Sequence, residues 1–165
     1  MNDIFLKRSS VRDFSDREVS EEQIKEILSA AMLAPSGMHK CPWDFVVVRD
    51  KGKLKELSKI GIWQKFISQS SVSIVVVGNE KESDMWVQDC SLVAGNIYLE
   101  AANQGLGSCW ANVYGKESKE ELIRELLNLP SDRRILCVMA IGYPKKEVSL
   151  KDKVYLKNKV HSETW

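Results

Sequence analysis

The 165-residue sequence lacks the motifs that mark several well-known kinds of catalytic and binding site. It has two histidines and four cysteines, and no two of the cysteines form a C-x-x-C pair, so a zinc site is not expected. A P-loop, a G-x-S-x-G nucleophile elbow, an H-E-x-x-H helix and a complete G-x-G-x-x-G fingerprint are also missing. These absences argue against zinc enzymes, P-loop hydrolases, serine hydrolases and classical dinucleotide-binding dehydrogenases.

An excess of charge and long apolar runs are missing as well. Lys and Arg total 24 and Asp and Glu 23, a formal net charge of +1, so no global field draws the chain to nucleic acid or to anionic lipid. The longest apolar runs have the length of strands, and no membrane span is predicted. The first ten residues do not resemble a signal peptide, and the four scattered thiols suit a reducing compartment, so a cytoplasmic protein is expected.

The hydrophobic patterns that are present predict one domain over residues 1–165, with an α/β or an α+β sheet. At this length, with 44% hydrophobic residues, the chain can bury a core without disulfides or metals. Four short β-rich runs alternate with about five helical patterns. The predicted strands are 43–48, 72–77, 108–113 and 135–141, and the main predicted helices begin at residues 20, 84 and 118.

Two helix starts carry the spacing of a capping box, Ser20 with Gln23 and Ser118 with Glu121. The helical pattern from Asp84 to Gln104 is apolar over more than one stripe. Such a helix is expected at the centre of the fold or against a partner chain.

The C-terminal segment 145–165 is too polar to add a helix to its own core. It carries lysines at 145, 146, 151, 153, 157 and 159 against only three acids. Two interpretations stay open: a solvated, frayed terminus, or an arm laid over another subunit, which the alternation of Val154, Leu156 and Val160 permits.

Three short segments contain the chemistry that the rest of the chain lacks. Residues 7–14 place Ser9 and Ser10 between Arg8 and Arg12, a set of donors that suits a phosphate, although two nearby arginines are also common on a plain surface. The loop 34–45, with two prolines and a glycine, could line a heteroaromatic ring or a diphosphate, or could be an ordinary helix-to-strand turn. Residues 105–112 permit a close backbone approach at two glycines.

The cysteine in that third segment has two interpretations of its own. Cys109 precedes Trp110, and a thiol there could act as a nucleophile. Neither histidine is near it in sequence, and a buried structural cysteine is the commoner case.

Taken in order and spacing, these segments resemble the FMN-dependent nitroreductase family over nearly the whole chain. Four motifs of the family carry the resemblance: R-x-S-x-[RK]-x-F, the P-S loop that ends in P-W-x-F, A-x-x-x-G-L-G-s-x-W, and G-Y-P. They are matched by Arg8, Ser10, Arg12 and Phe14; by Pro35, Ser36, Pro42, Trp43 and Phe45; by Ala101, Gly105, Leu106, Gly107, Ser108 and Trp110; and by Gly142, Tyr143 and Pro144.

The resemblance implies an α+β fold with three layers, α/β/α, and a central, mostly antiparallel sheet, in a domain-exchanged homodimer that holds FMN at the subunit interface. It implies hydride transfer from NAD(P)H through FMN to a nitroaromatic, quinone or related small-molecule acceptor, with no catalytic acid or nucleophile of the protein's own. The segment 145–165 is then an arm that reaches across to the partner. The cofactor-binding residues implied by position are Arg8, Ser9, Ser10, Arg12, Pro35, Ser36, Gly37, Met38, His39, Asn112, Val113, Tyr114, Gly115 and Lys153.

The sequence departs from the family in three places. His39 stands where the family usually has Asn, the tail has lysines where Arg is frequent, and no segment between Val77 and Asp84 is long enough for a substrate lid. Two other functions stay open beside the reductase: another flavin reaction on the same fold, such as oxidation, dehalogenation or flavin breakdown, and a flavin-binding dimer without turnover.

Overall fold

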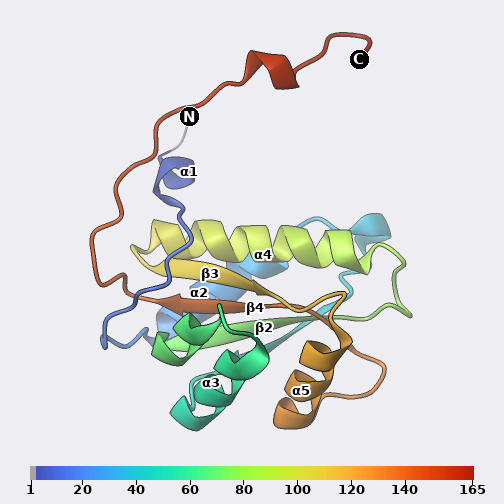
Figure 1. Cartoon of the computed structure of the whole chain (residues 1–165). Coiled ribbons are helices and arrows are strands. Elements are labelled where there is room, and N and C mark those ends of the chain that lie inside the picture. The colour runs from blue at the N-terminus through green and yellow to red at the C-terminus, as the bar shows by residue number, and fades with distance from the viewer. Residues whose placement is uncertain (1–2) are drawn as a thin grey trace.

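The computed structural model describes residues 3–165 as a sheet between two helical layers (Figure 1). The helices are α1 (Ile4–Lys7), α2 (Glu21–Met32), α3 (Lys51–Leu57), α4 (Trp86–Asn103) and α5 (Glu117–Leu127), and the strands are β1 (Trp43–Val48), β2 (Val72–Gly78), β3 (Gly107–Asn112) and β4 (Arg134–Gly142). The helices α2 and α4 cover one face of the sheet, and α3 and α5 cover the other. The α+β fold predicted from the sequence is confirmed.

The sheet has the order β1-β2-β4-β3, and every neighbouring pair of strands is antiparallel. The two central strands, β2 and β4, are buried along almost their whole length. Burial on both faces explains why residues 72–77 read as a continuous apolar run instead of an alternating one. The strand β3 lies at one edge, and its outer side is available to a segment from elsewhere in the chain.

The two faces of the sheet carry separate hydrophobic clusters. On one face, Ile27 of α2 and Val93 and Ile97 of α4 pack on β2 and β4. On the other face, Leu54 of α3 and Ile123 of α5 pack on the same strands and on β3. The helices therefore close both faces of the sheet and leave its two edges, β1 and β3, uncovered by these clusters.

The first of the two predicted capping boxes is confirmed and the second is wrong. At the start of α2, Ser20 Oγ accepts from the Gln23 amide at 3.2 Å, and Gln23 Oε1 accepts from the Ser20 amide at 3.1 Å. Helix α5 begins one residue before Ser118, and its N-cap residue, Lys116, makes no side-chain cap. A turn closed by the Lys116 amide on the Val113 carbonyl starts the helix early, so Ser118 already lies inside it.

This difference gives a paired prediction. The variant Ser20→Ala should lower the free energy of unfolding by about 1 kcal/mol, because the amide of Gln23 loses its acceptor at the helix start. The variant Ser118→Ala removes the same group from a position that caps nothing, and should change stability by less than about 0.5 kcal/mol. Urea unfolding followed by circular dichroism measures both, and equal losses in the two variants would contradict the assignment of the caps.

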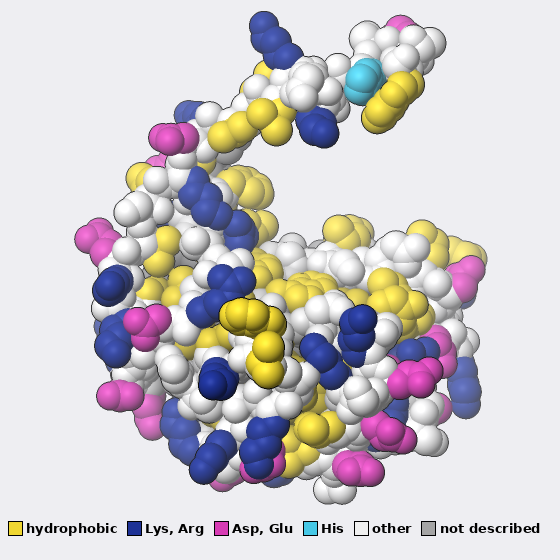
Figure 2. Space-filling model, in the orientation of Figure 1, with side chains coloured by type: hydrophobic (Ala, Val, Ile, Leu, Met, Phe, Trp, Pro, Cys, Tyr) yellow, Lys and Arg dark blue, Asp and Glu magenta, His cyan; other side chains and the backbone are white. Residues whose placement is uncertain are grey.

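The long helix α4 is buried on the side that faces the sheet, but not all round. Its apolar residue Leu92 is exposed, and Leu99 is half-buried. Hydrophobic side chains gather over α4 beneath the C-terminal arm (Figure 2). The second alternative given for this helix, contact with a partner chain, remains a prediction for that outer side.

The C-terminal arm runs away from the body of the protein (Figure 1), and residues 151–165 are exposed throughout. Its exposed apolar side chains are Leu150, Val154, Tyr155, Leu156, Val160 and Trp165. No helix within residues 3–165 is both long enough and apolar enough to cross a membrane.

Candidate functional site

The basic segment 8–12 lies along the outer edge of β3. The Val11 amide donates to the Ser108 carbonyl at 3.0 Å, and Ser10 pairs with Ser108 in a parallel bridge. A Cβ atom added to Gly107 would stand 2.6 Å from Val11 Cβ, so only glycine lets the segment come this close. The first and third sequence segments therefore meet at this edge.

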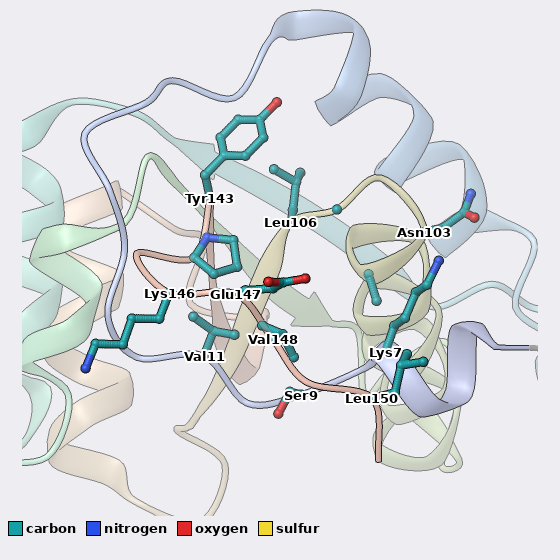
Figure 3. A pocket seen from close by; sticks show the side chains of 13 residues that line it. Lys7, Ser9, Val11, Asn103, Leu106, Tyr143, Lys146, Glu147, Val148 and Leu150 are labelled. Carbon is teal, nitrogen blue, oxygen red and sulfur yellow. The ribbon is translucent and has the colours of Figure 1, made fainter. Parts of the chain in front are cut away.

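The segment separates its side chains into two sets, because successive residues of an extended chain point to opposite sides. Ser9 and Val11 line a cavity of about 510 Å³ between the segment, the end of α4 and residues 143–150 (Figure 3). Arg8 instead lies over the ring of Tyr98, with 5.3 Å from its Cζ to the centroid. The alternation places Ser10 and Arg12 on the side of Arg8. Ser9, which was also predicted to bind the phosphate, faces the cavity on the opposite side.

Tyr98 fixes Arg8 to the scaffold. This residue of α4 also accepts, through its hydroxyl, a 2.7 Å hydrogen bond from the outward-facing amide of Trp110 on β3. The guanidinium is thus stacked on a ring that is itself tied to the edge strand. This stacking holds a planar charged donor beside β3 in one orientation.

A second cation approaches Arg8 from the tail. The Lys151 amide donates to the Leu6 carbonyl at 3.1 Å, which brings the start of the arm against helix α1. Partial desolvation, and then the charge of Arg8, lower the pKa of Lys151 below its usual value. Because this backbone bond holds Lys151 beside the segment that carries Arg8, the two cations suit an anion such as a phosphate.

The sequence comparison had pointed to Lys153 for this role. Lys153 lies two residues farther along the arm, and both lysines are exposed. The resemblance implied Lys153 by its position in the late family segment, but Lys151 belongs to the same K-D-K triplet. The tie between the arm and α1 favours Lys151.

At the far end of β3 lie residues 112–115, the second group of predicted cofactor-binding residues. Asn112 Nδ2 donates to the Tyr114 carbonyl at 3.0 Å, and Asn112 Oδ1 accepts from Trp110 Nε1 at 3.3 Å. Val113 is buried, and Gly115 has φ of +77°, which turns the chain sharply toward α5. Because Ser108 and Asn112 are four residues apart, an elongated ligand along the strand would span about 13 Å between the two parts.

Tyr114 packs against an aromatic and a charged neighbour. Its ring meets that of Trp86 edge to face, with 5.1 Å between the centroids. The guanidinium of Arg134 lies over both rings, with 5.8 and 5.9 Å from Cζ to the centroids. Arg134 is bonded in turn to the buried carboxylate of Glu120, at 2.9 Å from Nε to Oε1.

The loop between α2 and β1 is held in a strained conformation. Met38, His39 and Cys41 all have positive φ, of 51°, 58° and 48°, although none is glycine. The Gly37 amide donates to Asp89 Oδ1 at 3.0 Å, and Ser36 Oγ accepts from the Cys41 amide at 2.9 Å. Strain of this kind persists where the surroundings fix it, and it is concentrated at functional sites.

Within one chain this loop does not reach the basic segment. Gly37 is anchored at Asp89 in the first turn of α4, whereas Arg8 stacks on Tyr98 nine residues later, about 14 Å along the helix axis. Pro35, Gly37 and the exposed Met38 therefore sit at the opposite end of α4 from the cation pair. The assignment of this loop to a second subunit's flavin remains a prediction.

Cys109 is a structural residue in this fold. Burial raises the pKa of its thiol, although the charge of Arg12 opposes the shift. A thiol that stays protonated is a poor nucleophile, so the structure favours the second of the two interpretations given for it. Within residues 3–165, no group of three His, Cys, Asp or Glu side chains could hold a metal ion.

An antiparallel sheet between two helical layers, with a basic segment laid along its edge strand, defines a nitroreductase-type α+β protein. The model of the nitroreductase family matches residues 6–143. The chain therefore belongs to the nitroreductase family, as the four sequence motifs indicated.

Named relatives agree with this assignment. A protein of Archaeoglobus fulgidus named "Putative NADH dehydrogenase/NAD(P)H nitroreductase" is 42% identical over 164 residues, which cover 96% of this chain and 94% of the relative. The solved structure of an FMN-dependent nitroreductase from Clostridium difficile R20291 superposes with a TM-score of 0.92 at 36% identity and covers 98% of both chains. An iodotyrosine deiodinase of Thermotoga neapolitana is 28% identical over 166 residues, which cover 86% of this chain and 87% of the relative.

Proposed function

We propose that this chain is an FMN-dependent oxidoreductase that takes electrons from NAD(P)H and delivers them to a nitroaromatic, a quinone or a related acceptor. Family membership and the names of its relatives support the class of enzyme. The observation that carries the proposal is the pair of cations, Arg8 and Lys151, at one end of β3, with an open backbone segment at the other end. An elongated ligand with one anionic end and one flat end fits that arrangement.

In this proposal different residues bind the phosphate and the ring of the cofactor. Arg8, Ser10 and Lys151 bind the phosphate, since they supply charged and neutral donors on one side of the segment. Residues 112–115 meet the ring at the other end of β3. Bound FMN supplies the redox chemistry by accepting a hydride equivalent from NAD(P)H and passing its electrons to the acceptor. Arg12 places a positive charge where negative charge accumulates on reduction, and so favours the reduced form.

The proposal includes a homodimer. The resemblance assigns the loop 35–39 to the flavin of a second subunit, and the loop is anchored at Asp89, away from the phosphate end of the site in its own chain. The exposed apolar residues of the arm and the exposed Leu92 of α4 provide the surface that such a partner would cover. His39 and Met38 then face the ring from the partner's side.

Steady-state assays with NADH and NADPH, each against a panel of quinones, nitroaromatics and iodinated phenols, test the reaction. The proposal predicts turnover of several unrelated flat acceptors, because the connection between β2 and α4 spans only residues 79–85 and forms no lid. A protein that binds FMN but turns over only iodinated phenols would instead belong with the deiodinase relative. If bound FMN is reduced by neither donor, the protein is a flavin-binding dimer without turnover.

A further inference from the structure

The turn between two short 3-10 segments, η2 (Ser58–Ile60) and η3 (Lys65–Gln69), presents two bare hydrophobic side chains to solvent. Ile62 is 75% exposed and Trp63 is 79% exposed. The turn itself is firmly built, since the Gln64 amide donates to the Gly61 carbonyl at 3.1 Å and the flanking residues Ile60 and Phe66 are buried. The exposure of the indole therefore belongs to an ordered turn on a packed base.

This turn lies beside the ring end of the site. A Cβ atom on Gly61 would stand 3.6 Å from Lys119 Nζ, and the same Nζ donates to the Asn112 carbonyl at 3.4 Å. One lysine side chain thus connects the turn to the segment proposed to meet the flavin ring. Hydrophobic side chains protrude among Lys and Arg side chains over the turns that follow α3 in Figure 2.

The exposed indole is on a different surface from the one assigned to the partner subunit. Ile60, Phe66 and Ile67, which form the base of the turn, belong to the cluster of α3 and α5. The arm and the exposed side of α4 lie on the other side of the sheet (Figure 1). A small molecule at the ring end of β3 is therefore the occupant that its position favours.

We propose that Trp63 forms an aromatic wall of the acceptor site and stacks on flat, electron-poor aromatic acceptors while they take electrons. This inference rests on the proposed function. An indole has a large π face, offset stacking on it adds to the apolar area that is buried, and its few rotatable bonds limit the entropy lost on binding. In a site without a lid, such a wall selects for planarity and leaves the substituents of the acceptor unrestricted.

The test compares flat and non-flat acceptors in the FMN-loaded enzyme at saturating NADH. In the variant Trp63→Ala, we expect KM for 1,4-naphthoquinone and for nitrobenzene to rise about 3- to 10-fold, as the loss of one stacked pair predicts. With ferricyanide, which is not planar and needs no stacking, KM should stay within about twofold of the wild-type value. FMN affinity and the rate of flavin reduction by NADH should also be unchanged.

Two control variants separate stacking from other effects. Trp63→Phe keeps a π face and should retain most of the wild-type KM, whereas Ile62→Ala removes exposed apolar area from the same turn without removing a ring and should change KM less than twofold. Equal effects of Trp63→Ala and Ile62→Ala, equal effects on ferricyanide and naphthoquinone, or an unchanged KM for flat acceptors would each overturn the inference.

A shift of Trp63→Ala to a different oligomer in light scattering would also overturn it, because the indole would then be covered by a second copy of the chain. Failure of the proposed function looks different, since the wild-type protein itself would then not bind FMN or would not be reduced.

Discussion

Replacing Arg8 with alanine is expected to weaken FMN binding by about 1–3 kcal/mol, which raises the dissociation constant about 5- to 150-fold. The guanidinium provides planar charged donors for a phosphate. Because it is already stacked on Tyr98, the Arg8 side chain loses little conformational freedom when the phosphate binds. Arg8→Lys keeps the charge but loses the planar fork, and should fall between alanine and the wild type. Fluorescence titration of apoprotein with FMN measures all three.

Arg17 provides a matched control for this prediction. Its guanidinium also lies over a tyrosine, with 3.8 Å from Cζ to the centroid of Tyr143, but it belongs to no part of the proposed phosphate site. Arg17→Ala should therefore leave FMN affinity unchanged. Comparable losses in Arg8→Ala and Arg17→Ala would indicate a general effect of removing surface charge and would contradict the assignment.

The same titration decides between the two tail lysines. Because Lys151 is held against α1 beside Arg8, Lys151→Ala should weaken FMN binding more than Lys153→Ala. The opposite order would return the role to Lys153, the residue indicated by the family motif. Unchanged affinity in Arg8→Ala and in both lysine variants would refute the phosphate site as a whole.

Replacing Glu120 with alanine is expected to cost about 3 kcal/mol of the free energy of unfolding. The Glu120 carboxylate is 6% exposed, and its Oε1 accepts from Arg134 Nε at 2.9 Å, from the Ile135 amide at 3.1 Å and from Arg124 at 3.3 Å. Its removal leaves the buried Ile135 amide without an acceptor and takes one acceptor from each of two guanidinium groups. We place the loss at the lower end of the range for broken buried pairs, because Arg134 is partly exposed and keeps its bond to Glu80.

Glu117 in the first turn of the same helix serves as the control. It is exposed, so Glu117→Ala should change stability by less than about 0.5 kcal/mol. Urea unfolding compares the two variants, and a loss of less than about 1 kcal/mol in Glu120→Ala would contradict the structural role of the cluster. Because Arg134 lies over the rings of Trp86 and Tyr114, the Glu120 variant should also loosen the ring end of the site.

Much of the fold could be predicted from the sequence, because local pattern and tertiary environment agree in most elements. The apolar run 72–77 forms a central strand buried on both faces, and Ser20 with Gln23 forms a true capping box. The start of α5 was predicted wrongly, because a backbone turn from Val113 begins the helix before the Ser118 that carried the motif. Local spacing cannot reveal a turn that depends on how β3 ends.

The site was harder to predict than the fold. The motif around Arg8 predicts a phosphate segment, and the folded chain adds that this segment pairs with β3 at Ser108 and that Ser9 lines a cavity. Trp63 belongs to no motif, and Lys151 lies in the same K-D-K triplet as Lys153, the lysine that the family motif indicated. Lys151 gains its place from a backbone bond between the tail and α1, and Trp63 from the distance between its turn and Lys119. Contacts between residues so far apart in sequence arise only in the folded chain.

The central claim is that the edge of β3 holds FMN in a form that NAD(P)H can reduce. The most direct test is to add FMN to the purified chain, remove the unbound flavin by gel filtration, and record the visible absorption before and after anaerobic addition of NADH or NADPH. The account predicts a yellow protein whose flavin absorption is bleached by at least one of the two donors and returns when a quinone is added. A protein that leaves the column colourless, or a bound flavin that neither donor bleaches, would contradict it.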